Sequence, residues 1–238
     1  MCIRDSKVGD FVFGSDGEPT RIVHVDPQGV IPLRRVHFDD GASVVAGAGH
    51  LWEIKRKGRF PRVETTDWIR KQGYLHYNDG YMWRLPIIDP VNYPARDLPL
   101  DPYLMGTLIA NGDLKYGPDV TTPDIHVIDE LERRGVVLNK HKIDKNRCPH
   151  WGVPGIRDEL RELGLWGKVS RDKRIPRMYL EASDTARLDL LRGLMDGDGS
   201  SRSGGRRVCN YHTTSAGLSD DVAELVWSLG GRAKPVSY

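Results

Sequence analysis

Two similar segments of the chain carry the residues with the clearest chemical potential. They read YLMGTLIANG from Tyr103 to Gly112 and LLRGLMDGDG from Leu190 to Gly199. Corresponding glycines of the two segments lie 87 residues apart, Gly106 from Gly193 and Gly112 from Gly199. Just before the last glycine, the first segment has Asn111 and the second has Asp198. Carboxylates can hold Mg²⁺ against a phosphodiester, which activates a water and stabilises the leaving oxygen. An amide offers an oxygen without the charge, so the two segments are chemically unequal.

The similarity extends past these segments and indicates an internal duplication. In both copies a Thr-Thr pair precedes a helical run that ends at a glycine. The pairs are Thr121-Thr122 and Thr213-Thr214, and the runs are 124–134 and 219–229.

Each glycine-containing segment is predicted to be a helix. Asp101 followed by Pro102 is a typical helix start, and Asp184 is the candidate cap of the second helix. The terminal glycines are expected to stop both helices, which places Asn111 and Asp198 at helix ends.

The two segments resemble LAGLIDADG motifs, and the resemblance to that family of homing endonucleases covers Pro102 to about Ala233. It implies duplicated αββαββα-like halves whose saddle-shaped antiparallel sheets straddle double-stranded DNA. It also implies that the two helices pack side by side with Gly106 and Gly193 at their interface.

The family's metal-binding acid corresponds to Asp198 in the second motif and to Asn111 in the first. The resemblance therefore implies Mg²⁺ as cofactor, with these two residues as catalytic ligands and one centre impaired. Asp113 is an alternative ligand in the first copy. Asp196 faces another side of its helix and is expected to cap or pack.

The same resemblance implies a basic residue in the active site. Lys173, in DKRIP from Asp172 to Pro176, matches the family's lysine, and Arg174 is the alternative. The matching lysine of the other half is expected beyond Tyr238. Cations expected on the DNA-reading strands, or beside them, are Lys140, Lys142, Lys145, Arg174, Arg202, Arg206 and Arg207.

Residues Val8 to Trp52 predict a compact all-β unit, because GSDG, PQG and DDG turns separate β-branched and aromatic runs. The stretch from Val8 to Thr20, VGDFVFGSDGEPT, resembles the Hint protein-splicing domain of inteins. The resemblance implies that His50 polarises the peptide bond at the N-terminal splice junction; a hydrogen-bonded loop histidine is the alternative. Gly47 stands where the family usually has threonine.

The predicted organisation is α+β with two domains: a partial Hint domain over 1–95, of which 1–6 are interpreted as adapter sequence, and the endonuclease domain over 96–238, with an incomplete second half. The proline-rich stretch from Leu85 to Pro102 marks the boundary. Both splice junctions are expected to lie outside the chain, with exteins of a host protein as partners of the intact precursor.

Composition constrains the setting. The formal net charge is +2, but Lys140 to Arg207 holds 16 basic and 10 acidic residues, a local excess of 16 − 10 = +6 that favours a polyanion. The 3 cysteines form no C-x-x-C pair, which argues against a cysteine-rich zinc site. With neither a membrane-length apolar run nor a leader, the chain is expected to be a cytoplasmic monomer.

The sequence thus predicts an intein-borne homing endonuclease that binds a long double-stranded DNA site and hydrolyses it with Mg²⁺. The alternative is a cleavage-impaired DNA-binding protein or an inert remnant, because Asn111 replaces the first acid.

Overall fold

The computed structural model describes residues 6–74, 80–141, 148–202 and 208–236, without the side chain of residue 202. The chain divides into two compact units, which we call the hairpin unit (Met1–Val91 with Gly230–Tyr238) and the helix-pair unit (Asn92–Leu229). The division falls at Val91, close to the predicted boundary at residue 95. At the other end the structure differs from the predicted range 96–238, because the segment after Leu229 groups with the hairpin unit.

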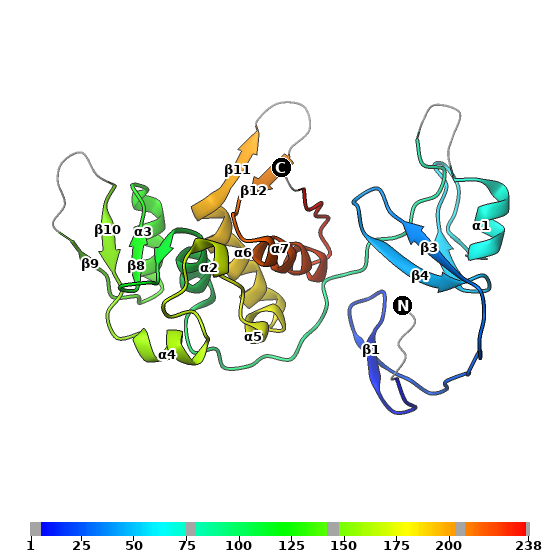
Figure 1. The fold of residues 1–238 in the computed structure, drawn as a ribbon, viewed down its shortest axis with the longest axis horizontal. Coiled ribbons are helices and arrows are strands. Elements are labelled where there is room, and N and C mark those ends of the chain that lie inside the picture. Colours follow the sequence, from blue (N-terminus) through cyan, green and yellow to red (C-terminus); the bar gives the residue numbers. More distant parts are fainter. Residues whose placement is uncertain (1–5, 75–79, 142–147, 203–207, 237–238) are drawn as a thin grey trace. The chain divides into compact units, whose positions relative to one another are not determined.

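The described residues of the hairpin unit form three antiparallel hairpins and one short helix (Figure 1). Glycines with positive φ, which residues with a side chain rarely adopt, lie in the turns of the first two hairpins: Gly17 at φ 77° and Gly41 at φ 94°. The paired strands are β1 (Phe11–Phe13) with β2 (Pro19–Arg21), β3 (Leu33–His37) with β4 (Ser43–Gly47), and β5 (Leu51–Ile54) with β6 (Arg62–Thr65), followed by α1 (Thr66–Gln72).

The returning segment is tied to the hairpin unit by contacts that cross almost the whole sequence. The guanidinium of Arg232 donates to both carboxylate oxygens of Asp39 at 2.9 and 3.0 Å. The ammonium of Lys234 donates to the Asp39 carbonyl at 3.2 Å. The helix-pair unit is therefore inserted between two parts of the hairpin unit.

The helix-pair unit contains the helices α2 (Pro102–Asn111), which is mostly buried, and α6 (Asp184–Asp198), which is buried along one face (drawn in Figure 1). Asp101 caps α2 as predicted, since its carboxylate accepts from the Leu104 amide at 3.0 Å. The cap of α6 is Ser183 and not the predicted Asp184; its hydroxyl accepts from the Ala186 amide at 3.3 Å. Both helices end at a glycine, at Gly112 and Gly199.

Similar elements follow the two helices. The order after α2 is strand, strand, helix, strand, strand, helix, and the order after α6 is strand, strand, helix. After α2 come β7 (Gly112–Asp113), β8 (Asp119–Thr121), α3 (Ile125–Arg133), β9 (Asn139–Lys140), β10 (His150–Gly152) and α4 (Arg157–Glu162). The short helices η1 (Ser170–Asp172) and α5 (Arg177–Leu180) lead to α6. After α6 come β11 (Gly199–Arg202), β12 (Val208–Tyr211) and α7 (Ala216–Ser228).

The strands of this unit are antiparallel. One sheet has the order β7-β8-β10-β9, and β11 pairs with β12. This order of helices and strands is α+β in content, while the named fold types of the sequence analysis stay predictions.

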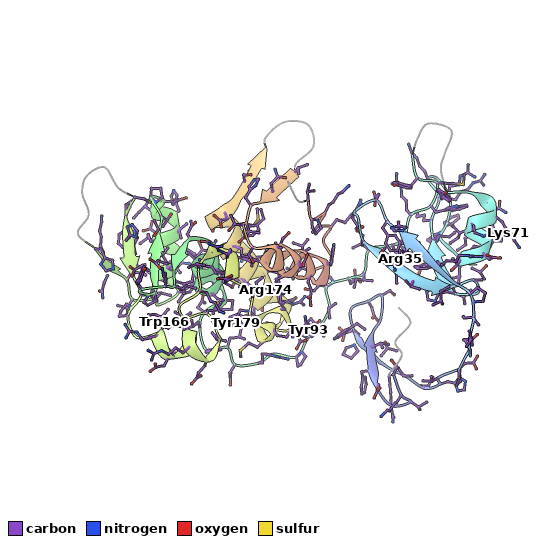
Figure 2. The ribbon with its side chains drawn as sticks, viewed as in Figure 1. Arg35, Lys71, Tyr93, Trp166, Arg174 and Tyr179 are labelled. Atoms are coloured by element: carbon purple, nitrogen blue, oxygen red, sulfur yellow. The ribbon has the colours of Figure 1, made fainter. Side chains whose placement is uncertain are left out.

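The main hydrophobic core lies in the helix-pair unit, where leucines of α2 and α6 meet side chains from the surrounding helices and strands. Tyr179 joins the core to the chain that enters the unit, because its hydroxyl donates to the Leu100 carbonyl at 2.9 Å (labelled in Figure 2). No helix in the described part of the chain is long and apolar enough to cross a membrane.

Candidate active site

The crossing of α2 and α6 brings two helix backbones into direct contact. A Cβ built on Gly106 would lie 2.2 Å from the Leu190 carbonyl oxygen, and one built on Gly193 would lie 2.2 Å from the Tyr103 carbonyl oxygen. No larger residue fits at either position without moving a backbone. The two glycines therefore set how closely the helices approach and align their C-terminal ends.

The residues at those ends are the candidate chemical groups. Asn111 is the last residue of α2, and it packs against Gly197, whose built Cβ would lie 3.3 Å from the Asn111 side-chain carbon Cγ. Asp198 is the last residue of α6 and is half-buried. Burial raises the pKa of the Asp198 carboxyl, while the charges of Lys173 and His212 act in the opposite direction. Asp196 is exposed, and its carboxylate accepts from the Tyr103 hydroxyl at 2.8 Å.

Lys173 lies beside these ends but is not an ordinary surface lysine. Its ammonium donates to three carbonyl oxygens at the end of α2, those of Leu108, Ile109 and Gly112, at 3.0, 2.9 and 2.7 Å. These are the carbonyls that a helix end leaves without partners. Burial lowers the pKa of Lys173 to about 8, and the Asp198 and Asp113 carboxylates act against that shift. Lys173 therefore fixes the end of α2 and lies within electrostatic reach of two carboxylates.

The segment that carries Lys173 is held in place by α7. The Ser215 hydroxyl donates to the Lys173 carbonyl at 3.0 Å and accepts from the Leu218 amide at 3.1 Å. The buried Asp221 carboxylate accepts from the Ile175 amide at 2.9 Å. These contacts fix the backbone on both sides of the lysine.

Arg174 is ion-paired with a residue of the same helix, α7. Its guanidinium makes two hydrogen bonds to Asp221, at 2.7 and 2.6 Å (labelled in Figure 2). The bidentate ion pair offsets the charge of Arg174, although 60% of its side chain is exposed. The contact of Arg174 with DNA stays a prediction.

Tyr211 was missed by the sequence analysis. It lies opposite Gly199 in the β11–β12 ladder, and its hydroxyl is buried with no hydrogen-bond partner among the described residues. Burial, and then the charge of Asp198, raise the pKa of Tyr211, so the hydroxyl stays protonated at neutral pH. Its neighbour His212 donates its backbone amide to the Asp198 carbonyl at 3.2 Å.

The first copy has an aliphatic residue in the place of Tyr211. Val120 lies opposite Gly112, as Tyr211 lies opposite Gly199. The helix caps give the same alignment, because the Asp124 and Ser215 amides each donate to a threonine hydroxyl, Thr122 and Thr213, at 3.1 Å. This pairs Thr122 with Thr213 and corrects the predicted pairing by one residue. The second copy thus has an acid and a phenol where the first has an amide and a valine.

The donor set can be compared with what Mg²⁺ requires. The described residues contain no group of three His, Cys, Asp or Glu side chains that could enclose a metal. Magnesium sites in proteins commonly use one or two carboxylates and complete the shell with water and substrate phosphates. Asp198, Asn111 and Asp113 supply oxygen atoms of the kind that such an open site uses, and Mg²⁺ as a cofactor stays a prediction.

The remaining predicted DNA contacts divide into two groups. Lys140 is exposed on β9, and its ammonium lies 5.0 Å from the centroid of the Trp151 ring. Lys142, Lys145, Arg206 and Arg207 lie outside the described residues, as does the side chain of Arg202.

His50 lies in the hairpin unit, between β4 and β5. Its ring is edge-on to Trp52, with centroids 4.7 Å apart, and its carbonyl accepts from the Thr66 amide at 2.9 Å. Burial lowers the pKa of His50, which favours the neutral imidazole. A side chain at Gly47 would meet Ile31, 2.7 Å from the built Cβ, so the threonine expected there would require repacking.

Comparison with known proteins finds a relative among proteins that act on DNA. No family model matches the chain. Over 257 residues the chain is 29% identical to a replicative DNA helicase DnaB of Mycobacterium intracellulare, and the match covers 97% of the chain and 40% of that protein. The chain therefore spans about 40% of the length of this relative.

This finding overturns the assignment to the intein and LAGLIDADG families. The protein that matches nearly the whole chain is named as a replicative helicase, not as a splicing element or homing endonuclease. The quoted motifs are short and consist of the residues that any close helix pair or tight hairpin requires, such as glycines at a crossing. The role of His50 in splicing is withdrawn with that assignment, as are the extein partners.

The contact between Ser215 and Lys173 makes a prediction that does not depend on any activity. In Ser215→Ala, the buried Lys173 carbonyl loses its hydrogen-bond donor, so the segment around Lys173 should unfold locally more often. The Lys173 ammonium is then exposed more often and should react about 5- to 10-fold faster with an acylating ester. Labelling followed by mass spectrometry of the peptide that contains Lys173 measures this rate.

The first copy provides the matched control for that experiment. Asp124→Ala also removes a helix cap, because Asp124 accepts from the His126 amide at 2.9 Å, but it touches no part of the Lys173 segment. Equal labelling of Lys173 in the two variants would show that the Ser215 contact does not hold the lysine.

Proposed function

We propose that the helix-pair unit binds double-stranded DNA and hydrolyses phosphodiester bonds with Mg²⁺ at a centre built around Asp198. The observation that carries this proposal is the half-buried Asp198 carboxylate at the end of α6, which has no hydrogen bond or ion pair from a side chain among the described residues. A desolvated carboxylate is costly to keep charged without a partner. Such a group is suited to binding a cation.

Mg²⁺, when bound, would lower the pKa of a water and neutralise charge on the scissile phosphate. Asp198 would hold it, with Asn111 or Asp113 supplying a further oxygen. The protein's own contribution is to fix these donors, through the glycine crossing of α2 and α6 and through the three carbonyl contacts of Lys173.

Lys173 adds positive charge beside the acids. With its pKa at about 8, it is mostly protonated at neutral pH, so it can stabilise negative charge that develops near Asp198. Because its ammonium is already bonded to three carbonyls, its part is electrostatic and positional.

The asymmetry of the two copies favours one working centre over two. Asn111 and Val120 stand in the first copy where Asp198 and Tyr211 stand in the second, so these two positions of the first copy have neither a carboxylate nor a phenol. We therefore propose a preference for nicking one strand.

The name of the DnaB relative supports DNA as the substrate and also suggests a second candidate, a segment of a DNA-unwinding enzyme that binds DNA without cutting it. The sequence contains no G-x-x-x-x-G-K-[ST] run, the loop that cradles nucleotide phosphates in P-loop ATPases. The second candidate thus rests on the comparison, while hydrolysis rests on residues of this chain.

A plasmid assay separates the two candidates. The protein is incubated with a supercoiled plasmid library with diverse inserts, with Mg²⁺ or with EDTA, and nicked ends are mapped by sequencing. Hydrolysis predicts Mg²⁺-dependent nicks at recurrent sequences. Salt-sensitive duplex binding without nicks would support the binding segment instead and would refute hydrolysis.

A further inference from the structure

The hairpin unit has a concentration of positive charge that neither the sequence analysis nor the proposed centre uses. The β5–β6 hairpin carries Lys55, Arg56, Lys57, Arg59 and Arg62, with no acidic residue between Glu53 and Glu64. All five side chains are exposed.

A sixth cation is added by a distant part of the chain. Arg84 forms an isolated bridge with Lys55, with amide-to-carbonyl distances of 2.8 and 2.9 Å, and its side chain is also exposed. Within the described residues, only Arg62 of this set has an ion pair, at 3.5 Å from Glu64. We call these six residues the basic hairpin.

The base of the basic hairpin is held by tryptophans. The guanidinium of Arg62 lies 4.1 Å from the centroid of the Trp68 ring and 5.2 Å from that of Trp83. The two rings are edge-on at 5.4 Å, and the Trp83 indole donates to the Gly73 carbonyl at 2.7 Å. Arg62 is therefore packed against two tryptophan rings.

Like charges at this density repel one another and weaken the fold unless an anion neutralises them. A regular array of phosphates can do so, because several cations release counterions together when they bind a polyanion. Phe60, between these cations, is 93% exposed and offers a flat apolar face beside them.

We propose that the basic hairpin is a second DNA-binding surface, which contacts the phosphates of duplex DNA. The choice of DNA among polyanions rests on the proposed function; the surface itself rests on the six clustered cations. It contacts the backbone without reading bases, so it should add affinity and salt dependence for any duplex sequence.

The experiment compares two triple variants of the full chain with the same change in net charge. One is Arg56→Gln, Lys57→Gln and Arg59→Gln in the basic hairpin. The other is Arg21→Gln, Arg34→Gln and Arg35→Gln, which removes three exposed arginines from β2 and β3 of the same unit. Binding to a duplex of arbitrary sequence is followed by fluorescence anisotropy at a series of salt concentrations, without Mg²⁺.

The hairpin variant is expected to lower the slope of log affinity against log salt by roughly 2 to 3, since each lost phosphate contact removes about 0.9. The control variant should keep most of the wild-type slope. Equal losses in both variants would show a general effect of net charge, and an unchanged slope in the hairpin variant would show no contact; either result overturns the inference.

These outcomes are distinct from a failure of the proposed function. If the protein binds duplex DNA with the expected loss in the hairpin variant but never nicks plasmid, the basic hairpin stands and hydrolysis fails. If wild-type protein nicks plasmid while the two variants bind alike, hydrolysis stands and the basic hairpin fails.

Discussion

Replacing Asp198 with asparagine is expected to reduce Mg²⁺-dependent nicking by about 100-fold or more, the range typical of losing one group that stabilises charge in the transition state. The amide carries no charge and binds Mg²⁺ less well. Duplex affinity without Mg²⁺ should not fall, because removing a carboxylate removes no contact to phosphate. Nicked-circle formation and anisotropy measure the two quantities separately.

The first copy allows the converse experiment. Asn111→Asp restores a carboxylate at the end of α2, so cleavage of the second strand should rise relative to nicking. Asp196→Asn is the control near Asp198, since Asp196 is bonded to Tyr103 and should leave the nicking rate within a few-fold of wild type. If unmodified protein already cuts both strands at matched rates, Asn111 is no defect and the proposed asymmetry is wrong.

Adding one methyl group at the helix crossing should be among the most destabilising changes in the helix-pair unit. In Gly106→Ala or Gly193→Ala the new carbon would lie 2.2 Å from a backbone oxygen of the other helix. The helices must separate, at a cost of about 3 kcal/mol. Hydrogen exchange in peptides from 102–111 and 184–198 measures this loss without interference from the hairpin unit.

The same substitution at an open glycine is the control. A Cβ on Gly117 would come no closer than 3.6 Å to its nearest neighbour, the Asp119 carboxylate. Gly117→Ala should therefore change protection of α2 and α6 by less than about 1 kcal/mol. Comparable losses at Gly106 and Gly117 would show that close approach of the helices does not govern their stability.

Local chemistry in the sequence predicted the elements that carry the candidate site. A capping aspartate before a proline marked the start of α2, and glycines marked the ends of α2 and α6. These signals are local, because a cap accepts a hydrogen bond from an amide only two or three residues later and the proline is already in a helical backbone conformation. The internal repeat placed Asn111 and Asp198 at equivalent helix ends. Family assignment was less secure, since short motifs of this kind recur wherever helices pack closely, and the comparison with a helicase overturned it.

Contacts between distant parts of the chain could not be predicted in this way. Lys173 was singled out, but its place against α2 depends on carbonyls more than 60 residues earlier, and Ser215 and Asp221 hold its segment from 40 or more residues later. The return of Arg232 to Asp39, which makes the helix-pair unit an insertion, has no local pattern either.

Helix ends, turns and the inequality of the two copies could be predicted from the sequence, because each depends on residues near one another in the chain. The tertiary structure alone decided that Arg174 is paired, that Lys173 is a buried helix-end contact, and that Tyr211 lies beside Asp198. Hydrogen-bond partners and burial depend on which backbone segments pack together in space. Periodicity in the sequence indicates whether a segment is a helix or a strand, but not which other segment it packs against.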